Sequence, residues 1–420
     1  MFITAMASFA FANLNPTNYL GGVGFRPERD IPDLGGKVVL ITGGNAGLGK
    51  ETIRQLLQHN PAHIFLAARS EQKAHAALDE LRASAPDGSH TKLTWLPLDL
   101  SSTPSVRDAA ASFKAQSPRL DILILNAGVM SLPPGETDLG HEIQLGTNHT
   151  GHFLLTTLLL STLVRTAEEG PDSDVRVVSL SSIGHNLAPS FPTILDQEKL
   201  KRCNTHARYG ASKVANILFA AELARRYPSV TAVSVHPGLI ATDLYGPMGK
   251  RNPVAALGSK VLGAVGTQVD VGARNQLWAA VGAKKKELVN GAYYVPVGIC
   301  KGYNRYARSE EMGRELWEWS EREVRKGAAS KDSSFPEHQS FFDRTLQPHH
   351  PHHSEDQQNK PALERRDSQS QGQGKEEIEM PIPAQPQHHR RRSSTLQRLR
   401  EYMQNEDELD DAGKTFAKLM

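Results

Sequence analysis

Residues 37–50 read KVVLITGGNAGLGK, and they begin the alternation of strands and helices that predicts the fold class. An apolar, β-branched run, Val38–Thr42, gives way to glycines at Gly43, Gly47 and Gly49, after which a helical pattern begins. Small residues at such a junction let backbone amides and a helix N-terminus approach a pyrophosphate. The spacing differs from the Gly-x-Gly-x-x-Gly fingerprint, and a tight turn without a ligand explains it equally well on its own. Its place in the first strand–helix–strand unit favours a nucleotide-binding turn.

The same alternation of strand and helix continues along the chain. Further apolar runs are HIFLAA, KLTWLPL, DILILNAG, VRVVSLS and TAVSVHPG, and the helical patterns cover Gly49–His59, Glu71–Ala83, Pro104–Gln116, His141–Thr166, Tyr209–Arg226, Val271–Val281 and Ser309–Lys326. Near-continuous apolar strands are typical of a parallel sheet with helices on both faces. With a last strand near Ala292–Pro296, the sequence predicts an α/β fold, a single-domain Rossmann-type doubly wound parallel sheet of about seven strands.

Composition along the chain predicts three segments. Residues 1–34 form an N-terminal extension, residues 35–330 the Rossmann-type domain, and residues 331–420 a largely disordered polar tail. The tail is rich in His, Gln, Ser, Pro and charged residues, and such a composition buries too little apolar area to order itself. The first dozen residues are apolar but contain no positively charged side chain, so we expect no signal peptide.

Charge and cysteine content argue against several classes of function. The chain carries 48 lysines and arginines against 46 acids, a formal net charge of +2, so we expect no nucleic acid partner. Its two cysteines, Cys203 and Cys300, are too few for a disulfide scaffold or a zinc site. We therefore predict a cytoplasmic protein without a metal. The longest apolar stretch, Phe153–Val164, is shorter than the ~20 residues that a membrane span needs.

The end of the second strand indicates which dinucleotide binds. A nucleotide with a free ribose 2′-hydroxyl usually meets an acidic side chain there, about 20 residues past the glycines. This chain has Ala67, Ala68 and Arg69 at that place. The guanidinium of Arg69 offers a planar cationic fork that grips a 2′-phosphate through charge-assisted hydrogen bonds. We therefore predict NADP(H) as the cofactor; the alternative for this one side chain is an ordinary solvated arginine.

A tyrosine and a lysine at helical spacing supply the acid/base chemistry that hydride transfer requires. Reduction of a carbonyl leaves an alkoxide-like oxygen that needs a proton. In Tyr209-Gly-Ala-Ser-Lys213 the lysine lies on the same helix face as the tyrosine, and its ammonium favours phenolate over phenol. Among nine tyrosines, only Tyr209 has a lysine at the fourth following position. The alternative is an exposed pair without a function.

A polar donor beside this tyrosine is predicted at the carboxyl end of the fifth strand. That strand delivers Ser179, Ser181 and Ser182 at the place where ligands bind in such sheets. Serines at strand ends are often only turn formers. Their order along the chain favours Ser182 as the residue that holds the carbonyl oxygen.

In this order, these features resemble the short-chain dehydrogenase/reductase family over about residues 35–300. The matching motifs are Thr42-Gly43-x-x-x-Gly47-x-Gly49 for the pyrophosphate, Asp99-Leu100 for the adenine, Asn126-Ala127-Gly128 supporting the sheet, Asn148 on the long helix, Ser182, Tyr209 with Lys213, and Pro237-Gly238. The resemblance implies that Ser182 orients the substrate oxygen, Tyr209 exchanges its proton, and Lys213 makes the tyrosine more acidic and binds the ribose. It also implies that Asn148 holds a water of the proton relay. Backbone near Leu48 and Ile240, with Thr242, would hold the cofactor's other end.

The gap between Ser182 and Tyr209 is longer than in many family members. In this it resembles the branch that contains retinol dehydrogenases and the oxidoreductase that carries WW domains. Two segments are predicted to build the substrate pocket: Ile183–Leu200, with His185, Leu187 and Phe191, and the stretch after Pro237, with Leu244, Val254, Leu257, Val261, Leu262 and Val265. Their apolar character favours a small lipophilic carbonyl or alcohol as substrate.

Three interpretations of the function are open at this point. The first is an NADP(H)-dependent oxidoreductase that interconverts a carbonyl and an alcohol, with Tyr209 as general acid/base. The second is a catalytically weak NADP(H)-binding sensor or scaffold that acts through the C-terminal tail. The third places the same enzyme at a membrane surface through residues 1–12, a contact that we do not predict. The resemblance further implies a homodimer or homotetramer paired through the helices of Asn148 and Tyr209, which apolar periodicity alone leaves open.

Overall fold

The computed structural model describes residues 23–238, 268–300, 305–306 and 308–329. Most of the predicted N-terminal extension and the whole predicted tail lie outside the described residues. The same holds for Ile240, Thr242 and the second predicted pocket segment, from Leu244 to Val265. The division of the chain into three segments therefore stays a prediction.

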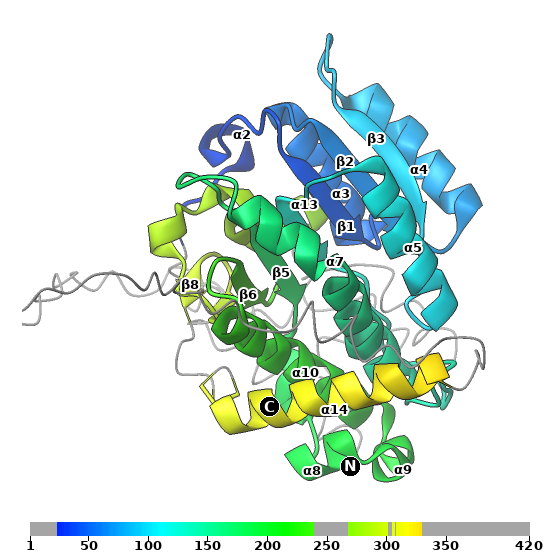
Figure 1. The fold of residues 1–420 in the computed structure, drawn as a ribbon. Coiled ribbons are helices and arrows are strands. Elements are labelled where there is room, and N and C mark those ends of the chain that lie inside the picture. The colour runs from blue at the N-terminus through cyan, green and yellow to red at the C-terminus, as the bar shows by residue number, and fades with distance from the viewer. Residues whose placement is uncertain (1–22, 239–267, 301–304, 307, 330–420) are drawn as a thin grey trace, which may run out of the picture. The chain divides into compact units, whose positions relative to one another are not determined.

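A mostly parallel sheet, buried except in its edge strands, runs through the described residues (Figure 1). Its strands are β1 (Val38–Thr42), β2 (His63–Ala68), β3 (Lys92–Pro97), β4 (Ile122–Leu125), β5 (Arg176–Leu180), β6 (Thr231–Val235), β7 (Tyr293–Val295) and β8 (Ile299–Cys300). Their order is β3-β2-β1-β4-β5-β6-β7-β8, and every neighbouring pair is parallel except β7 and β8. The order changes direction at β1 and β4, and ligands of such sheets bind in the crevice there, at the carboxyl ends of the strands. The predicted Rossmann-type fold is confirmed, with one short antiparallel strand in addition.

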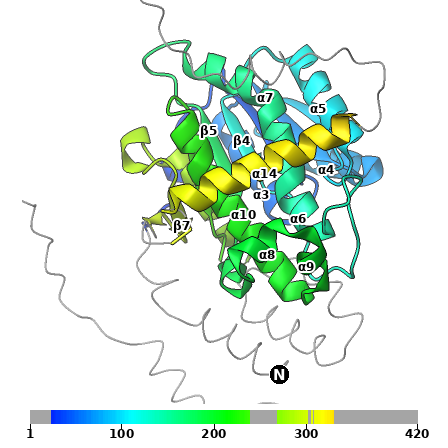
Figure 2. The ribbon, with the colours of Figure 1, turned by 60° about the horizontal axis from the view of Figure 1, so that its bottom comes forward.

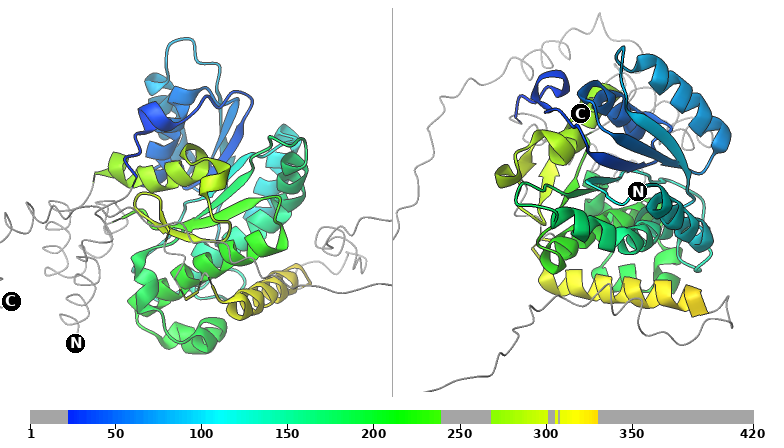
Figure 3. Two further views of the ribbon diagram at one scale, coloured as in Figure 1. Left: turned by 90° about the vertical axis from the view of Figure 1, so that its left-hand side faces the viewer. Right: turned by 45° about the horizontal axis from the view of Figure 1, so that its top comes forward.

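Helices cover both faces of the sheet (Figures 1 and 3). The helices α3 (Gly47–Leu56), α4 (Glu71–Ser84) and α13 (Val269–Leu277) cover one face, and α5 (Thr103–Gln116), α7 (Gly151–Ala167) and α10 (Thr205–Arg226) the other. Within β1, Val39 and Ile41 join the first core layer, whereas Val38 and Leu40 join the second. Because both faces are buried, the strand is apolar at almost every position. None of the described helices combines the length and apolarity required to cross a bilayer.

The helix predicted over His141–Thr166 contains a π-helical segment. It consists of α6 (Ile143–Leu145), π-helical Gly146–Thr150 and α7. The chain is crowded here, because a Cβ on Gly151 would overlap the carbonyl oxygen of Leu100. Single π-helical turns are rare and occur often at functional sites. This one carries Asn148.

The helix that carries Tyr209 begins earlier than predicted. Asn204 caps it, because its side-chain oxygen accepts two backbone N–H groups of the first turn at 3.0 Å each. Such a cap fixes the start of a helix, so α10 begins at Thr205 instead of Tyr209. The long gap after Ser182 is filled by a 3-10 turn (Ile183–Leu187), α8 (Phe191–Leu195) and α9 (Gln197–Arg202).

A further helix, α14 (Glu310–Ala329), lies across α7 and α10 (Figure 2). Its Trp317 is 1% exposed, and the ring centres of Phe153 on α7 and Phe219 on α10 lie 5.0 and 5.9 Å away. The chain itself therefore covers parts of both helices that were predicted to pair two subunits. The homodimer or homotetramer stays a prediction.

Candidate active site

The glycine-rich turn after β1 is shaped for close approach by a phosphate. Gly43 and Gly47 have positive φ angles of 67° and 51°, which glycine adopts without strain. A Cβ at Gly49 would overlap the carbonyl oxygen of Gly43 and lie 2.6 Å from Asn126 Nδ2. At the start of α3, the N-cap residue Ala46 has no polar side chain with which to bind the first backbone N–H groups. These donors and the helix dipole fit the pyrophosphate of a dinucleotide.

Asn126 and Ala127 attach this turn to the end of β4. Asn126 Nδ2 donates to the carbonyl oxygen of Thr42 at 2.9 Å, and the N–H of Ala127 donates to Thr42 Oγ1 at 2.9 Å. A Cβ on the following Gly128 would lie 3.6 Å from Lys213 Nζ. The segment predicted to support the sheet therefore lies between the nucleotide turn and the predicted catalytic lysine.

The neighbouring strands β2 and β3 end beside the residues predicted to hold the adenosine part. Arg69 follows β2 and is exposed, so its guanidinium is accessible to a ligand at this edge. Asp99 follows β3, and its Oδ1 accepts from the N–H and the hydroxyl of Ser101 at 2.9 and 2.6 Å, which orients the carboxylate. Leu100 is buried, whereas Leu48 in the first turn of α3 is partly buried.

Tyr209 and Lys213 lie together near the start of α10. Tyr209 is 8% exposed and Lys213 is 5% exposed, and Lys213 Nζ lies 5.5 Å from the centre of the Tyr209 ring. This ammonium donates to the carbonyl oxygen of Leu180, at the end of β5, at 2.8 Å. Burial lowers the pKa of Lys213 to about 7. The lysine therefore changes charge near neutral pH, directly beside the predicted acid/base.

Ser182 lies close to the Tyr209 ring, because Gly184, which lies between them, has no side chain. Ser182 Oγ accepts from the N–H of Gly184 at 3.1 Å. A Cβ on Gly184 would lie 2.8 Å from Cε1 of Tyr209 and 3.4 Å from Ser182 Oγ. The structure therefore brings together three of the four predicted catalytic residues, Ser182, Tyr209 and Lys213.

Asn148 is the fourth, and its side chain is fully buried. Its Oδ1 accepts from the N–H of Val129 at 2.7 Å, and its Nδ2 donates to the carbonyl oxygen of Val129 and to Ser212 Oγ at 2.9 Å each. Both hydrogens of the amide group are thus in use. A water held by Asn148 would have to donate to its oxygen atoms, and this role stays a prediction.

Pro237 and Gly238 follow β6 at the same edge of the sheet. Gly238 has a φ of 100°, a conformation that favours glycine. Both residues are partly buried. The loop continues to Ile240 and Thr242, which lie outside the described residues, so their contacts with the cofactor stay predictions.

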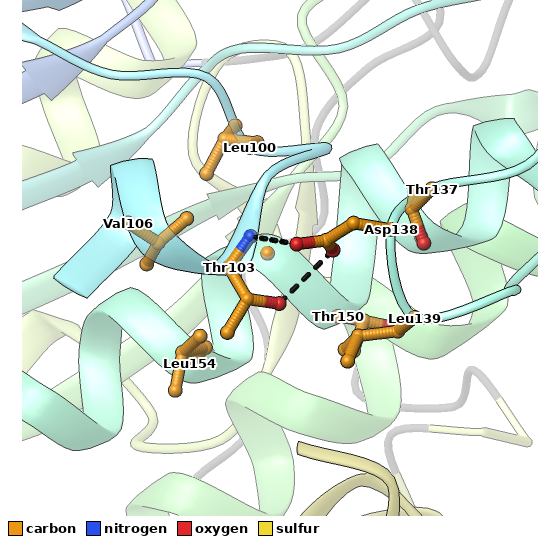
Figure 4. Close-up of a pocket in the computed structure, with 10 residues that line it drawn as sticks. Leu100, Thr103, Val106, Thr137, Asp138, Leu139, Thr150 and Leu154 are labelled. Atoms are coloured by element: carbon orange, nitrogen blue, oxygen red, sulfur yellow. Dashed lines mark hydrogen bonds between the residues drawn. The ribbon is translucent and has the colours of Figure 1, made fainter. Parts of the chain in front are cut away.

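A small cavity of about 10 Å³ lies beside the π-helical segment (Figure 4). Leu100, Thr150 and Leu154 line it together with Asp138, whose carboxylate accepts from the N–H and the hydroxyl of Thr103 at 2.7 and 3.0 Å. This volume is about that of one water molecule. The cavity is therefore too small for a substrate, and it does not include any of the four predicted catalytic residues.

Comparison with known proteins decides the family. The family model for short chain dehydrogenases matches residues 37–191. The short-chain dehydrogenase/reductase drtF of Aspergillus calidoustus is 38% identical over 309 residues, which cover 70% of this chain and 96% of the relative. This chain belongs to the short-chain dehydrogenase/reductase family.

Two further similarities agree with this assignment. Retinol dehydrogenase 12 of Mus musculus is 38% identical over 287 residues, which cover 67% of this chain and 84% of the relative. A crystal structure of an uncharacterized protein from Mycobacterium Paratuberculosis is 29% identical, with a TM-score of 0.52 over 71% of this chain and 97% of that chain. The predicted family and its retinol-dehydrogenase-like branch are confirmed. As a short-chain dehydrogenase/reductase, the chain is an NAD(P)-dependent oxidoreductase of carbonyls and alcohols.

A buried ion pair that was not predicted from the sequence lies next to Tyr209 in this dehydrogenase/reductase. Arg208 Nη1 lies 2.8 Å from Glu142 Oε1, and the two side chains are 3% and 1% exposed. The other carboxylate oxygen accepts from the N–H groups of Gln144 and Leu145 at 3.0 and 2.9 Å, and so caps α6. The pair joins the start of α6 to the start of α10. Charged residues of either type are common on helix surfaces, so no sequence signal distinguishes this pair.

Glu142→Gln is expected to lower the free energy of unfolding of this short-chain dehydrogenase/reductase by about 3–5 kcal/mol. The substitution keeps the size of the side chain but leaves the Arg208 guanidinium buried without its counter-charge. Urea unfolding measures the loss. Asp79→Asn, in an exposed pair with Arg82, is the control and is expected to change little. Equal effects of the two substitutions would contradict the assignment of a buried pair.

Proposed function

We propose that this protein is an NADP(H)-dependent oxidoreductase that interconverts a carbonyl and an alcohol on a small lipophilic substrate. The observation that carries the proposal is the buried contact of Tyr209 with Lys213, beside Ser182 and close to the ends of the central strands. A phenol and an ammonium that are both nearly excluded from water, next to a nucleotide turn, form a proton donor matched to hydride chemistry.

The residues present fit a dinucleotide. The glycine turn and the N-terminus of α3, including the backbone near Leu48, would hold the pyrophosphate, and Asp99 and Leu100 the adenine. Lys213 would bind the ribose, and Asn126-Ala127-Gly128 would form the floor of the dinucleotide site. When bound, the nicotinamide supplies or accepts the hydride. Ile240 and Thr242 are the proposed contacts at that end.

The chain's own groups would then handle the oxygen and its proton. The Ser182 hydroxyl donates to the substrate oxygen and holds it beside Tyr209. In reduction the Tyr209 hydroxyl gives its proton to this oxygen, and in oxidation the phenolate takes it back. The ammonium of Lys213 favours the phenolate, and its pKa of about 7 means that this charge is present up to neutral pH. The reduced NADP pool of a cell favours reduction as the direction.

The side chains around His185 support a lipophilic substrate. His185 is 6% exposed, and the ring centres of Tyr293 and Tyr306 lie 5.3 and 6.1 Å from it. Ile183 is also buried. Ile183 and His185 follow Ser182 along the chain, and His185 Nδ1 lies 2.7 Å from the carbonyl oxygen of Ser182, so this group adjoins the proposed site. The name of the relative retinol dehydrogenase 12 gives a lipophilic alcohol as its substrate, which supports the same class here.

Arg69→Ala is expected to weaken NADPH binding by about tenfold to a hundredfold and to leave NADH binding nearly unchanged. The substitution removes the fork proposed to grip the 2′-phosphate, and a charge-assisted hydrogen bond contributes about 1.5–3 kcal/mol. Nucleotide fluorescence gives both Kd values. Arg82→Ala, at an exposed arginine of α4, is the matched control. A similar loss for NADH and NADPH would reject the assigned preference.

A panel of aldehydes and ketones of increasing chain length, assayed with NADPH and with NADH, tests the proposed function itself. Turnover with NADPH that rises with the apolar length of the carbonyl is expected. No turnover by a folded protein that binds NADPH would instead favour the sensor or scaffold.

A further inference from the structure

Thr42, the residue before the glycine turn, is hydrogen-bonded to a histidine of α7. Thr42 Oγ1 lies 2.8 Å from His152 Nε2, and the other ring nitrogen, Nδ1, lies 3.0 Å from the backbone carbonyl oxygen of Asn148. Thr42 Oγ1 also accepts the N–H of Ala127. Thr42, His152 and Asn148 are at most 2% exposed. Water therefore cannot readily replace a bond that is lost here.

The partners allow only one direction for each of these hydrogen bonds. A carbonyl oxygen only accepts, so His152 Nδ1 carries the proton that is donated to Asn148. In a neutral imidazole Nε2 is then an acceptor, and the hydroxyl of Thr42 must donate to it. Burial lowers the pKa of His152 to about 4, which keeps the ring neutral near pH 7.

The connection continues from Asn148 to the helix turn of Tyr209. Asn148 Nδ2 donates to Ser212 Oγ at 2.9 Å, and the hydroxyl of Ser212 donates to the backbone carbonyl oxygen of Tyr209 at 2.7 Å. A series of buried hydrogen bonds, linked through Asn148 itself, thus joins the nucleotide turn to the proposed proton donor in the order Thr42, His152, Asn148, Ser212 and Tyr209.

We infer that His152 is a positioning residue that couples the nucleotide turn to the catalytic end of α10. Through Nε2 it orients the Thr42 hydroxyl, and with it the backbone of the glycine turn and of Ala127. Through Nδ1 it holds the Asn148 peptide, whose side chain supports Ser212 and the turn of Tyr209. The inference rests on the proposed function, because it assigns His152 a role toward the same nucleotide and the same proton donor.

Two conservative variants separate the two contacts of His152. The amide nitrogen of asparagine reaches about as far as Nδ1, so His152→Asn keeps the bond to Asn148 and loses the one to Thr42. The amide oxygen of glutamine reaches about as far as Nε2, so His152→Gln keeps an acceptor for Thr42. We expect His152→Asn to raise the Kd for NADPH about tenfold with kcat nearly unchanged. His152→Gln should lower kcat about tenfold with Kd nearly unchanged, because each variant lacks one buried hydrogen bond.

His149 supplies the matched control on the same helix. It is 1% exposed, and its Nε2 lies 2.8 Å from Ser320 Oγ of α14, so it contacts a helix that does not belong to the site. His149→Phe is expected to lower stability while Kd and kcat stay within about twofold. His152→Phe is expected to raise Kd and to lower kcat, each by about tenfold. Effects of His149→Phe equal to those of His152→Phe would reduce the role of His152 to stability, and the inference would fail.

A measurement without nucleotide keeps this inference separate from the proposed function. In a double-mutant cycle, Thr42→Val and His152→Phe are expected to change the free energy of unfolding non-additively, because they remove the same bond. Additive effects would overturn the inference. An unsubstituted protein that binds neither NADPH nor NADH would overturn the proposed function. Normal NADPH binding and turnover in all His152 variants would overturn the inference alone.

Discussion

Tyr209→Phe is expected to lower kcat by about a hundredfold to ten-thousandfold and to leave the Kd for NADPH nearly unchanged. A general acid contributes about this much to the rate, and the substitution removes only its hydroxyl. The ring still fits against Gly184, where even a Cβ would lie 2.8 Å from it, and beside the Lys213 ammonium. Consumption of NADPH with a reducible carbonyl gives kcat, and nucleotide fluorescence gives Kd.

Tyr227→Phe provides the matched control at the other end of α10. Tyr227 follows the last residue of that helix and contacts Trp317, with ring centres 6.4 Å apart. Burial raises its pKa to about 12, so it is a poor proton donor. We expect normal kcat and Kd for this variant. Turnover by Tyr209→Phe at the rate of the unsubstituted protein would reject Tyr209 as the acid/base.

The sheet and most helices were predictable because they depend on local patterns. Strand β1 was visible as a continuous apolar run. Glycines marked the turn after it, because Gly43 and Gly47 have positive φ angles and a Cβ at Gly49 would overlap the carbonyl oxygen of Gly43. Tyr209 and Lys213 were predictable as a pair because a helix places residues four apart on one face. The start of α10 at Thr205 was not predicted, because it is set by the Asn204 cap.

The remaining features depend on contacts between residues far apart in sequence. Glu142 and Arg208 form a buried pair only because α6 and α10 meet. His152 appears in the sequence as one histidine among 17, and its hydrogen bond to Thr42 joins two residues that are 110 positions apart. The helix over Ser309–Lys326 was predicted, but its packing against α7 and α10 was not.

Lowering the pH from 7 to 5 is expected to reduce the free energy of unfolding by about 2 kcal/mol for each of three fully buried histidines. Burial lowers the pKa of His149 and His236 to about 3 and that of His152 to about 4. At pH 5 these rings stay neutral in the folded protein, whereas in the unfolded chain, with a pKa near 6.5, they take up protons. The unfolded state thus binds more protons. The stability is complete above about pH 6.5 and is lost as the pH falls toward the folded values.

Together the three histidines are expected to lower the free energy of unfolding by about 6 kcal/mol between pH 7 and pH 5. This loss is comparable to the whole stability of many domains. Urea unfolding at pH 7, 6 and 5 measures the loss.

His149→Phe removes one of the titrating groups. The free energy of unfolding of this variant should therefore fall less steeply with decreasing pH, because its unfolded state takes up about one proton fewer. His75→Phe, at an exposed histidine, should leave the slope unchanged. Hydrogen bonds with Arg119 and Val38 lower the pKa of Asp121 despite its burial. The stability that such carboxylates contribute is therefore lost only at more acidic pH. A slope unchanged by His149→Phe would therefore contradict a neutral buried ring at that position.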